Sequence, residues 1–316
     1  MDDIRNFALE IEENVGRVMV GQADALRLLL VAMLVEGHVL LEDVPGVGKT
    51  MLARALAVSL GGEFRRLQCT PDLLPNDVTG VSVFNQKTGE FEFRPGPVFV
   101  NVLLVDEINR ATPRTQSALL EAMQERQVSV DGVTRALPLP FLVLATQNPI
   151  EYEGTFPLPE AQLDRFALRL TLGYPGRADE KTILRRLLGA HPIESIRAVA
   201  EPGALAALQK RIWEVHVDET LYDYIVSLSE ATRSHPDLAL GVSPRGSLAL
   251  FKCSQAAAAI DGRDFVRPDD VKALVPHVFP HRIILKPDAG LRGLTQTGII
   301  RGLMERVPLP LETVEG

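Results

Sequence analysis

A glycine-rich turn between an apolar strand and a helix constrains the fold of this chain more than any other feature of its sequence. The run HVLLED (38–43) is typical of a buried strand, TMLARALAVSL (50–60) is typical of a helix, and a short turn joins them. Gly46 and Gly48 let the backbone curl so that its N–H groups face one point, where the start of the helix adds positive partial charge. This arrangement predicts a loop that binds the phosphates of a nucleotide.

Different residues of this loop are expected to contact different parts of a nucleoside triphosphate and its metal ion. Lys49 supplies a point charge to the β- and γ-phosphates, and Thr50 supplies a hydroxyl to Mg²⁺. The full pattern G-x-x-x-x-G-K-[ST] has glycine where Asp43 stands, so we expect a working loop with a differently shaped entry. A chance glycine turn is the alternative, and the ordered strand, turn and helix count against it. The loop residues expected to bind the nucleotide are Pro45, Gly46, Val47, Gly48, Lys49, Thr50 and Met51.

A second apolar strand, NVLLVDE (101–107), ends in two acids. The ends of parallel strands share one edge of a sheet, so we expect Asp106 to hold Mg²⁺, directly or through water, and Glu107 to orient the attacking water. The alternative to a catalytic role is that both acids are simply solvated at a strand end. This alternative is less favoured because the glycine loop precedes the acids in the order expected for a nucleotide site. Arg110 and Arg114 follow the acids, where they could face a neighbouring subunit's nucleotide. The default interpretation is that they are solvated residues at the start of a helix.

Three further polar residues are candidates for a role in hydrolysis of the nucleotide. Asn148, at the end of FLVLATQN (141–148), is placed to hold the lytic water, although an asparagine before proline is also common in turns. Arg165 precedes the last apolar strand and has the chemistry of an arginine finger, with a plain ion pair to Asp164 or Glu160 slightly favoured on sequence alone. Arg245 would open a later helix and reach the nucleotide from there, or be an exposed first-turn arginine.

Apolar strands alternate with helices through the first half of the chain, which predicts an α/β core with a parallel sheet. Two hairpin signals interrupt this rhythm, one within 70–100 and one at 127–137 with Asp131-Gly132 at its tip. Beyond Gly176 the pattern is helical. We therefore expect a nucleotide-binding domain over 1–175 and a helical lid domain over 176–316. The remaining predicted strands are FRRLQC (64–69) and FALRLTL (166–172).

Composition limits the class of protein further. The two cysteines among 316 residues, Cys69 and Cys253, form neither a disulfide framework nor a metal-ligand spacing. A net charge of -8 argues mildly against binding to nucleic acid. The first residues lack the features of a signal peptide, and the longest apolar stretch, Leu28–Val35, is too short to cross a bilayer. We expect a soluble cytoplasmic protein without a membrane span.

The ordered set of motifs resembles the AAA+ ATPases, and specifically the MoxR family. The resemblance runs from VMVGQ (18–22) through LLEDVPGVGKT, LLVDEINRATPRTQSALLEAMQE, LATQNP, FPLPEAQLDRF and SPRGSLAL to PHVFPHRI (276–283), nearly the whole chain. It implies a five-stranded parallel sheet of order 5-1-4-3-2. It also implies that Asn148 is sensor 1, that Arg165 acts as an arginine finger on the neighbouring subunit's ATP, and that Arg245 is sensor 2. The residues implied to lie near the adenine are Val20, Gly21 and Gln22.

The same resemblance implies how the protein works. It identifies 70–100 as an insert in helix 2 and 127–137 as the hairpin before sensor 1, beside the magnesium chelatase and MCM groups. Family members form rings, usually hexamers, and often act as chaperones with von Willebrand factor A domain partners that mature or insert metal cofactors. We therefore expect a ring that hydrolyses ATP with Mg²⁺ to remodel a client protein.

Two other functions compete with this expectation. A DNA-acting motor is disfavoured by the acidic balance and by the few basic residues in FNQKTGEFEF and VSVDGVTR. A nucleotide switch without turnover is disfavoured because Glu107 and Asn148 are both present.

Overall fold

The computed structural model describes residues 1–147, 154–186, 188 and 191–309. The chain divides into two compact units, one of 7–158 and 170–207, called here the sheet unit, and one of 1–6, 159–169 and 208–316, called the helical unit. The domain boundary expected at residue 175 stays a prediction. In the described part of the chain, no helix is both long and apolar enough to cross a membrane.

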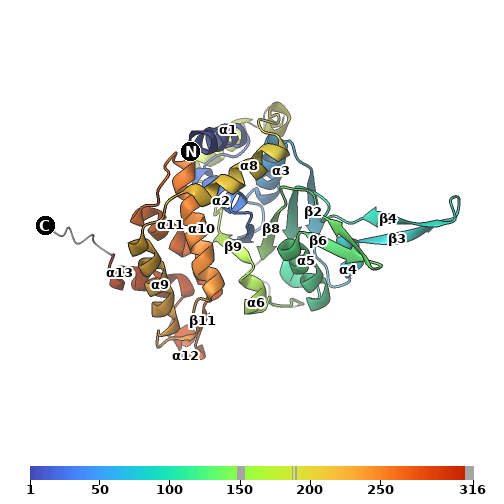
Figure 1. Cartoon of the computed structure of the whole chain (residues 1–316). Coiled ribbons are helices and arrows are strands. Elements are labelled where there is room, and N and C mark those ends of the chain that lie inside the picture. The colour runs from blue at the N-terminus through green and yellow to red at the C-terminus, as the bar shows by residue number, and fades with distance from the viewer. Residues whose placement is uncertain (148–153, 187, 189–190, 310–316) are drawn as a thin grey trace. The chain divides into compact units, whose positions relative to one another are not determined.

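A five-stranded parallel sheet is the centre of the fold (Figure 1). Its strand order is β2-β5-β8-β1-β9, which confirms the predicted order 5-1-4-3-2 when the core strands are counted along the chain. Every residue of the inner strand β5 is buried, because helices cover both faces of a parallel sheet. The strands are β1 His38–Glu42, β2 Phe64–Gln68, β5 Val102–Asp106, β8 Leu142–Gln147 and β9 Phe166–Leu170.

The register of the sheet brings the ends of its strands together. Gln68 pairs with Asp106 at the end of β2 and β5, and Glu42 pairs with Gln147 at the end of β1 and β8. Because the strands are parallel, the polar residues that follow each apolar run meet at one edge.

Helices flank the sheet and join its strands. Helix α5 begins with Thr112 as N-cap, which accepts a hydrogen bond from the Thr115 N–H, and with Pro113 as the first helical residue. Helix α2 ends at Leu34, and a left-handed residue, Glu36, follows it with a φ of 57°. The helices of the chain up to residue 211 are α1 Asp2–Gly16, α2 Ala23–Leu34, α3 Lys49–Ser59, α4 Pro75–Thr79, η1 Ile108–Arg110, α5 Pro113–Glu125, α6 Glu160–Leu163, α7 Arg177–Arg186, η2 Pro192–Ser195 and α8 Pro202–Arg211.

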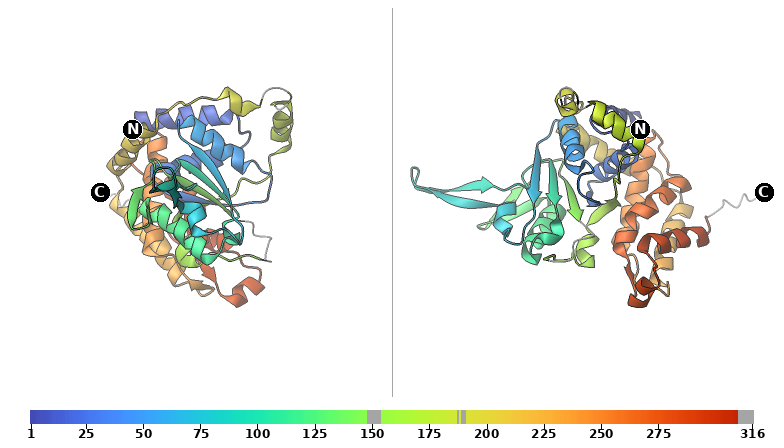
Figure 2. Two further views of the ribbon diagram at one scale, coloured as in Figure 1. Left: turned by 90° about the vertical axis from the view of Figure 1, so that its right-hand side faces the viewer. Right: turned by 180° about the vertical axis from the view of Figure 1, so that it is seen from behind.

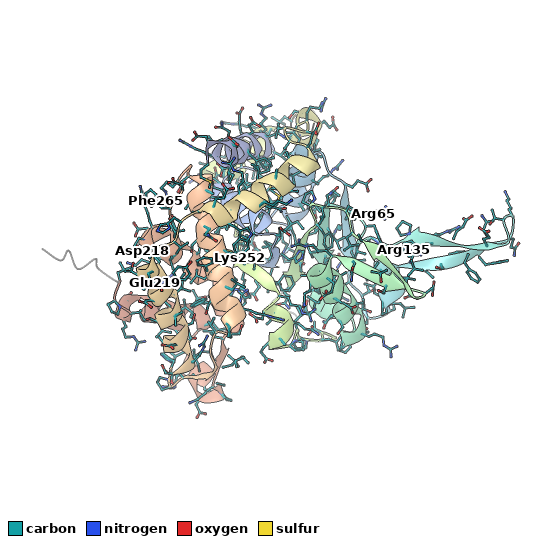
Figure 3. The ribbon with its side chains drawn as sticks, viewed as in Figure 1. Arg65, Arg135, Asp218, Glu219, Lys252 and Phe265 are labelled. Carbon is teal, nitrogen blue, oxygen red and sulfur yellow. The ribbon has the colours of Figure 1, made fainter. Side chains whose placement is uncertain are left out.

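Two antiparallel hairpins lie in the segments where the sequence predicts them. The longer one, β3 Gly80–Asn85 with β4 Glu90–Pro95, extends away from the sheet (Figure 1 and the right view of Figure 2). The shorter one pairs β6 Gln127–Val130 with β7 Val133–Ala136, and positive φ angles at Asp131 and Gly132 form its tight turn. Arg135 of β7 lies near the base of the longer hairpin (Figure 3), with its guanidinium 3.9 Å from the ring centre of Phe93.

The helical unit follows the predicted pattern, with one addition. A two-stranded antiparallel ribbon of β10 and β11 lies among its helices, in runs too short to stand out in the sequence. Helices α9, α10 and α11 form its core around buried Leu228, Leu250 and Leu274. Its elements beyond residue 211 are η3 Ile212–Glu214, α9 Glu219–Arg233, β10 Leu238–Leu240, α10 Pro244–Ile260, α11 Pro268–Val278, η4 Pro280–Arg282, β11 Ile284–Leu285, α12 Pro287–Leu291 and α13 Gln296–Arg306.

Candidate active site

The glycine loop between β1 and α3 has the curled backbone that phosphate binding requires. Gly46 and Gly48 have φ angles of 87° and 93°, in the left-handed region that glycine enters without strain. A Cβ atom at Gly48 would also lie 3.2 Å from the Cε of Met19. Lys49 is the first residue of α3, and its Nζ donates to the carbonyl oxygens of Asp43 and Val44, each at 3.1 Å.

Asp43 has a structural role that explains its departure from the phosphate-loop pattern. Its side chain is buried, and Oδ1 accepts a hydrogen bond from the N–H of Val44 at 2.8 Å. Oδ2 accepts from the N–H groups of Leu172 and Gly173 at 2.6 and 3.0 Å. The carboxylate therefore ties the start of the loop to the segment that follows β9, a contact that glycine at this position could not make.

A polar cavity of about 320 Å³ lies against the loop at the edge of the sheet. It brings together the loop residues Lys49 and Thr50 with Asp106 and Glu107 from the end of β5. The complete lining is Asp43, Pro45, Gly46, Gly48, Lys49, Thr50, Met51, Arg66, Gln68, Asp106, Glu107, Thr146 and Gln147. Nucleotide phosphates, a metal ion and a water molecule are the ligands that this set of cationic, hydroxyl and carboxylate groups can hold.

The two acids are held in different ways. Asp106 is buried, and its oxygens accept from Arg66 Nε at 2.5 Å and from Thr146 Oγ1 at 3.2 Å. Glu107 is more exposed and accepts from Gln68 Nε2 at 2.9 Å and from Arg110 Nη1 at 3.0 Å.

The backbone at Glu107 is also unusual. Its φ of 55° lies in the left-handed region, and its N–H donates to Thr146 Oγ1 at 2.9 Å. Such a conformation is costly for a residue with a side chain and is typically maintained at functional sites. Thr146 thus contacts both acids and fixes the turn that directs Glu107 into the cavity.

Four residues of this site were not identified from the sequence. Arg66, Gln68 and Thr146 are polar residues near the ends of β2 and β8, and that position was the signal that could have found them. Arg110 was expected to be solvated at a helix start. Its guanidinium instead forms an ion pair with Glu107, at the i,i+3 spacing that one helical turn allows.

Cys69 lies next to the acids but does not share their chemistry. Its side chain is buried, and burial together with the negative charges of Asp106 and Glu107 raises the pKa of its thiol to about 12. The thiol therefore stays protonated at neutral pH, so it is neither a nucleophile nor a metal ligand here.

The donor set fits Mg²⁺. Across 1–147, 154–186, 188 and 191–309, no three or more His, Cys, Asp and Glu side chains gather into a group that would hold a metal ion by themselves. Mg²⁺ is commonly held by one or two protein oxygens together with substrate phosphates and water. The carboxylate of Asp106 and the hydroxyl of Thr50, in one cavity with the phosphate loop, provide such oxygens.

An apolar cavity of about 200 Å³ adjoins the polar one, because both are lined by Gly46, Gly48 and Met51. A flat apolar ligand such as a nucleotide base fits this lining. Of the residues expected near the adenine, Val20 and Gln22 line this cavity, whereas Gly21 lines a neighbouring one. The lining is Val18, Met19, Val20, Gln22, Gly46, Val47, Gly48, Met51, Pro175, Ile183, Arg186, His191 and Pro192.

Neither Arg165 nor Arg245 is among the described residues that line these cavities. Asn148 lies outside the described residues. Arg165 and Arg245 belong to the helical unit, Arg165 half-buried just before β9 and Arg245 exposed in the first turn of α10. The ion pair suggested between Arg165 and Asp164 or Glu160 stays a prediction, and the Asp164 carboxylate has other partners. That carboxylate accepts from Arg282 Nε at 2.9 Å and from Ser243 Oγ at 2.8 Å.

Comparison with known proteins gives matches over nearly the whole chain. Residues 38–168 match the ATPase family associated with various cellular activities, and residues 230–301 match the AAA lid domain. YeaC of Bacillus subtilis is 52% identical over 98% of this chain and 97% of its own. The chaperone MoxR1 of Mycobacterium tuberculosis is 43% identical over 94% of this chain and 80% of its own. The crystal structure of a proposed ATPase from Cytophaga hutchinsonii matches with a TM-score of 0.92 and 38% identity, over 98% of this chain and 96% of that chain.

Proposed function

The chain belongs to the MoxR family of AAA+ ATPases, and from this premise we propose that it binds ATP with Mg²⁺ in the two adjoining cavities and hydrolyses it to ADP and phosphate. One observation carries the proposal. The polar cavity brings Lys49, Thr50, Asp106 and Glu107 together beside an apolar cavity of the kind that holds a base.

Each of these residues has a defined task in the proposed reaction. Lys49 and the N–H groups of the loop bind the phosphates, and Thr50 with Asp106 holds the metal ion. Mg²⁺, when bound, neutralises charge on the phosphate oxygens. Glu107 orients and polarises the attacking water, and the donors Gln68 and Arg110 keep its carboxylate directed to one side of the cavity.

The site is completed by a neighbouring subunit in this proposal. Subunits form a ring, a hexamer in the form usual for the family, and Arg165 of one subunit stabilises the transferring phosphoryl group on the next. Arg245 acts as sensor 2 and Asn148 as sensor 1. Hydrolysis therefore depends on assembly.

The proposed role of the ring is to remodel a client protein. The Mycobacterium tuberculosis relative is named a chaperone, which supports this role. A partner with a von Willebrand factor A domain delivers the client, whose maturation includes insertion of a metal cofactor. In this division of labour, residues 1–175 bind the nucleotide and residues 176–316 form the lid, as the matches over 38–168 and 230–301 support.

Replacing Glu107 by glutamine tests the proposed reaction. Glutamine keeps the size of the side chain but cannot act as a base, so Glu107→Gln should bind ATP with an affinity within about threefold of the parent. It should release phosphate at least 100-fold more slowly, in line with general-base losses of about 10²–10⁴. The exposed Glu121, on α5, gives a matched control as Glu121→Gln, which should keep the parent rate. Phosphate release by Glu107→Gln at the parent rate would remove Glu107 from its role.

A further inference from the structure

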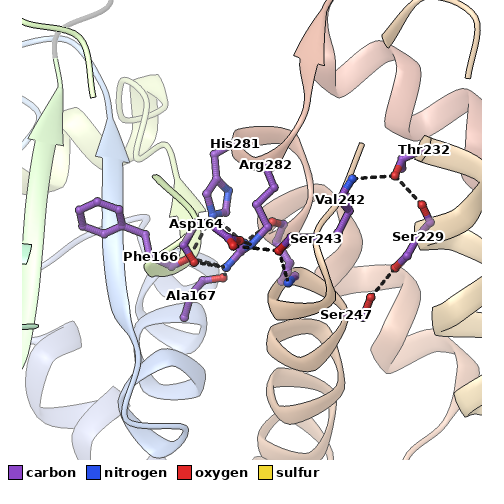
Figure 4. A network of polar contacts seen from close by, with 12 residues as sticks. Asp164, Phe166, Ala167, Ser229, Thr232, Val242, Ser243, Ser247, His281 and Arg282 are labelled. Atoms are coloured by element: carbon purple, nitrogen blue, oxygen red, sulfur yellow. Dashed lines mark hydrogen bonds and ion pairs between the residues drawn. The ribbon is translucent and has the colours of Figure 1, made fainter. Parts of the chain in front are cut away.

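A buried arginine in the helical unit stands out among the charged residues. Arg282 is 4% exposed, and its Nε donates to Asp164 Oδ1 at 2.9 Å (Figure 4). The second oxygen of the same carboxylate accepts from Ser243 Oγ at 2.8 Å. A charge this deep is tolerated only when it is paired and its remaining donors are also satisfied.

Besides contacting the Val278 carbonyl oxygen and the His281 ring, the remaining donors of Arg282 bind the backbone beside Arg165. Nη2 donates to the carbonyl oxygen of Phe166 at 2.6 Å, and Nη1 donates to that of Ala167 at 3.3 Å. Arg282 therefore holds the chain on both sides of Arg165, through the side chain of Asp164 before it and through two carbonyl groups after it. The direction in which Arg165 leaves the backbone is fixed by these contacts.

The other end of this network is the start of α10. Ser243 is the N-cap of that helix, so the hydroxyl that donates to Asp164 also accepts from the Gly246 N–H at 3.4 Å. Gly246 packs directly against the arginine, since a Cβ atom there would lie 2.8 Å from Arg282 Cδ. Arg245 is thus carried on a helical turn that contacts Arg282 through both a hydrogen bond network and close packing.

Helix α9 fixes the same turn from its other side. Thr232 Oγ1 accepts from the Val242 N–H at 2.9 Å, and the hydroxyls of Ser229 and Ser247 are 2.8 Å apart (Figure 4). The start of α10 is therefore held independently of Arg282, which leaves Arg165 as the residue whose position depends most on the buried guanidinium.

We propose that Arg282, through Asp164 and Ser243, is a positioning residue that fixes Arg165 and ties it to the helical turn carrying Arg245. The inference rests on the proposed role of Arg165 as the residue that completes a neighbouring site. It assigns no contact between Arg282 and ATP. Loss of the guanidinium should consequently lower the rate of hydrolysis while leaving the affinity for nucleotide unchanged.

The experiment compares Arg282→Lys and the milder Asp164→Asn with a matched control elsewhere in the helical unit. Arg263 provides that control, because its ion pair with Asp270 at 2.7 Å is also shielded, with side chains 14% and 12% exposed. For each full-length variant, kcat, the dissociation constant of a fluorescent ATP analogue and the melting temperature are measured. Arg282→Lys and Asp164→Asn should each lose at least tenfold in kcat, with affinity within twofold of the parent. Arg263→Lys should lose comparable stability and keep its kcat.

Arg165→Ala separates failure of this inference from failure of the proposed function. If Arg165→Ala is slow and both network variants turn over normally, the positioning role of Arg282 is overturned and the function stands. If Arg165→Ala itself keeps the parent kcat, the proposed role of Arg165 fails and the inference falls with it. The double variant Arg165→Ala, Arg282→Lys should match Arg165→Ala within twofold, and a further tenfold fall would show that Arg282 acts elsewhere.

Discussion

Replacing Asp43 by glycine restores the full phosphate-loop pattern, and the structure predicts that this apparent repair destabilises the protein. The parent carboxylate accepts three backbone N–H groups, from Val44, Leu172 and Gly173. In Asp43→Gly all three lose their acceptor, two of them in a segment more than a hundred residues away in the chain. The start of the loop then has no hydrogen-bonded tie to the segment after β9.

The expected loss of stability in Asp43→Gly follows from the number and kind of these hydrogen bonds. Hydrogen bonds to a charged group each contribute about 1.5–3 kcal/mol. Water can reach part of the exposed N–H groups in the variant, so we take about 3 kcal/mol for the loss of the three bonds. Glycine adds roughly 0.5–1 kcal/mol by increasing the entropy of the unfolded chain. The total is about 3.5–4 kcal/mol, so at about 2–4 °C per kcal/mol for a protein of this size the melting temperature should fall by roughly 7–16 °C.

Calorimetry and urea unfolding would measure this loss in the nucleotide-free protein. Asp43→Ala loses the same hydrogen bonds without the glycine entropy, so it should be destabilised slightly less than Asp43→Gly. Asp43→Asn keeps one acceptor oxygen and should lie between these variants and the parent. If Asp43→Gly melts within 2 °C of the parent, the carboxylate is not the anchor described above.

Two further predictions concern the titration of a core residue and the metal site. His38 is buried, and burial lowers its pKa from 6.5 to about 4. The unfolded chain therefore binds more protons between these values, and stability is lost as the pH falls from 6.5 to about 4, by about 1.4 kcal/mol per pH unit. Urea unfolding should show about 2 kcal/mol less stability at pH 5 than at pH 7 from this residue, and an unchanged pH dependence in His38→Gln would contradict it. Arg66 forms its ion pair with the carboxylate expected to hold Mg²⁺, and its side chain is 52% exposed. An exposed pair contributes up to about 1 kcal/mol, so Arg66→Met should lower the Mg²⁺ concentration needed for half-saturation by nucleotide about two- to fivefold. No change or a rise in that concentration would show that Arg66 does not compete with the metal.

The sequence was sufficient to predict structure wherever the structure depends on residues that are close together in the chain. The strand, glycine turn and helix over 38–60 predicted the loop, because each residue type there is required by the backbone within a few positions. The start of α5 depends on residues that are equally close in the chain, since Thr112 and Pro113 act within one turn of the helix. The order of the sheet came from the family resemblance rather than from the apolar runs alone.

Contacts between distant segments could not be predicted in this way. Asp43 was judged by its place in a motif, whereas its structural partners, at 172 and 173, are adjacent only after β9 joins the sheet. Arg66 meets Asp106 because β2 pairs in register with β5, and nothing within either strand indicates that pairing. Asp164 was one of two partners suggested for Arg165 because they are close in sequence, while the fold brings Arg282 to it from 118 residues away.

The most direct test of the account is to mix two inactive chains. Lys49→Ala lacks the lysine of its own phosphate loop but keeps Arg165, and Arg165→Ala keeps its loop but lacks the arginine. If each ATP site is shared between neighbours, co-assembled rings containing both chains should release phosphate at a measurable fraction of the parent rate, although each chain alone does not. Rings verified to contain both chains that remain as inactive as either chain alone would contradict the shared site.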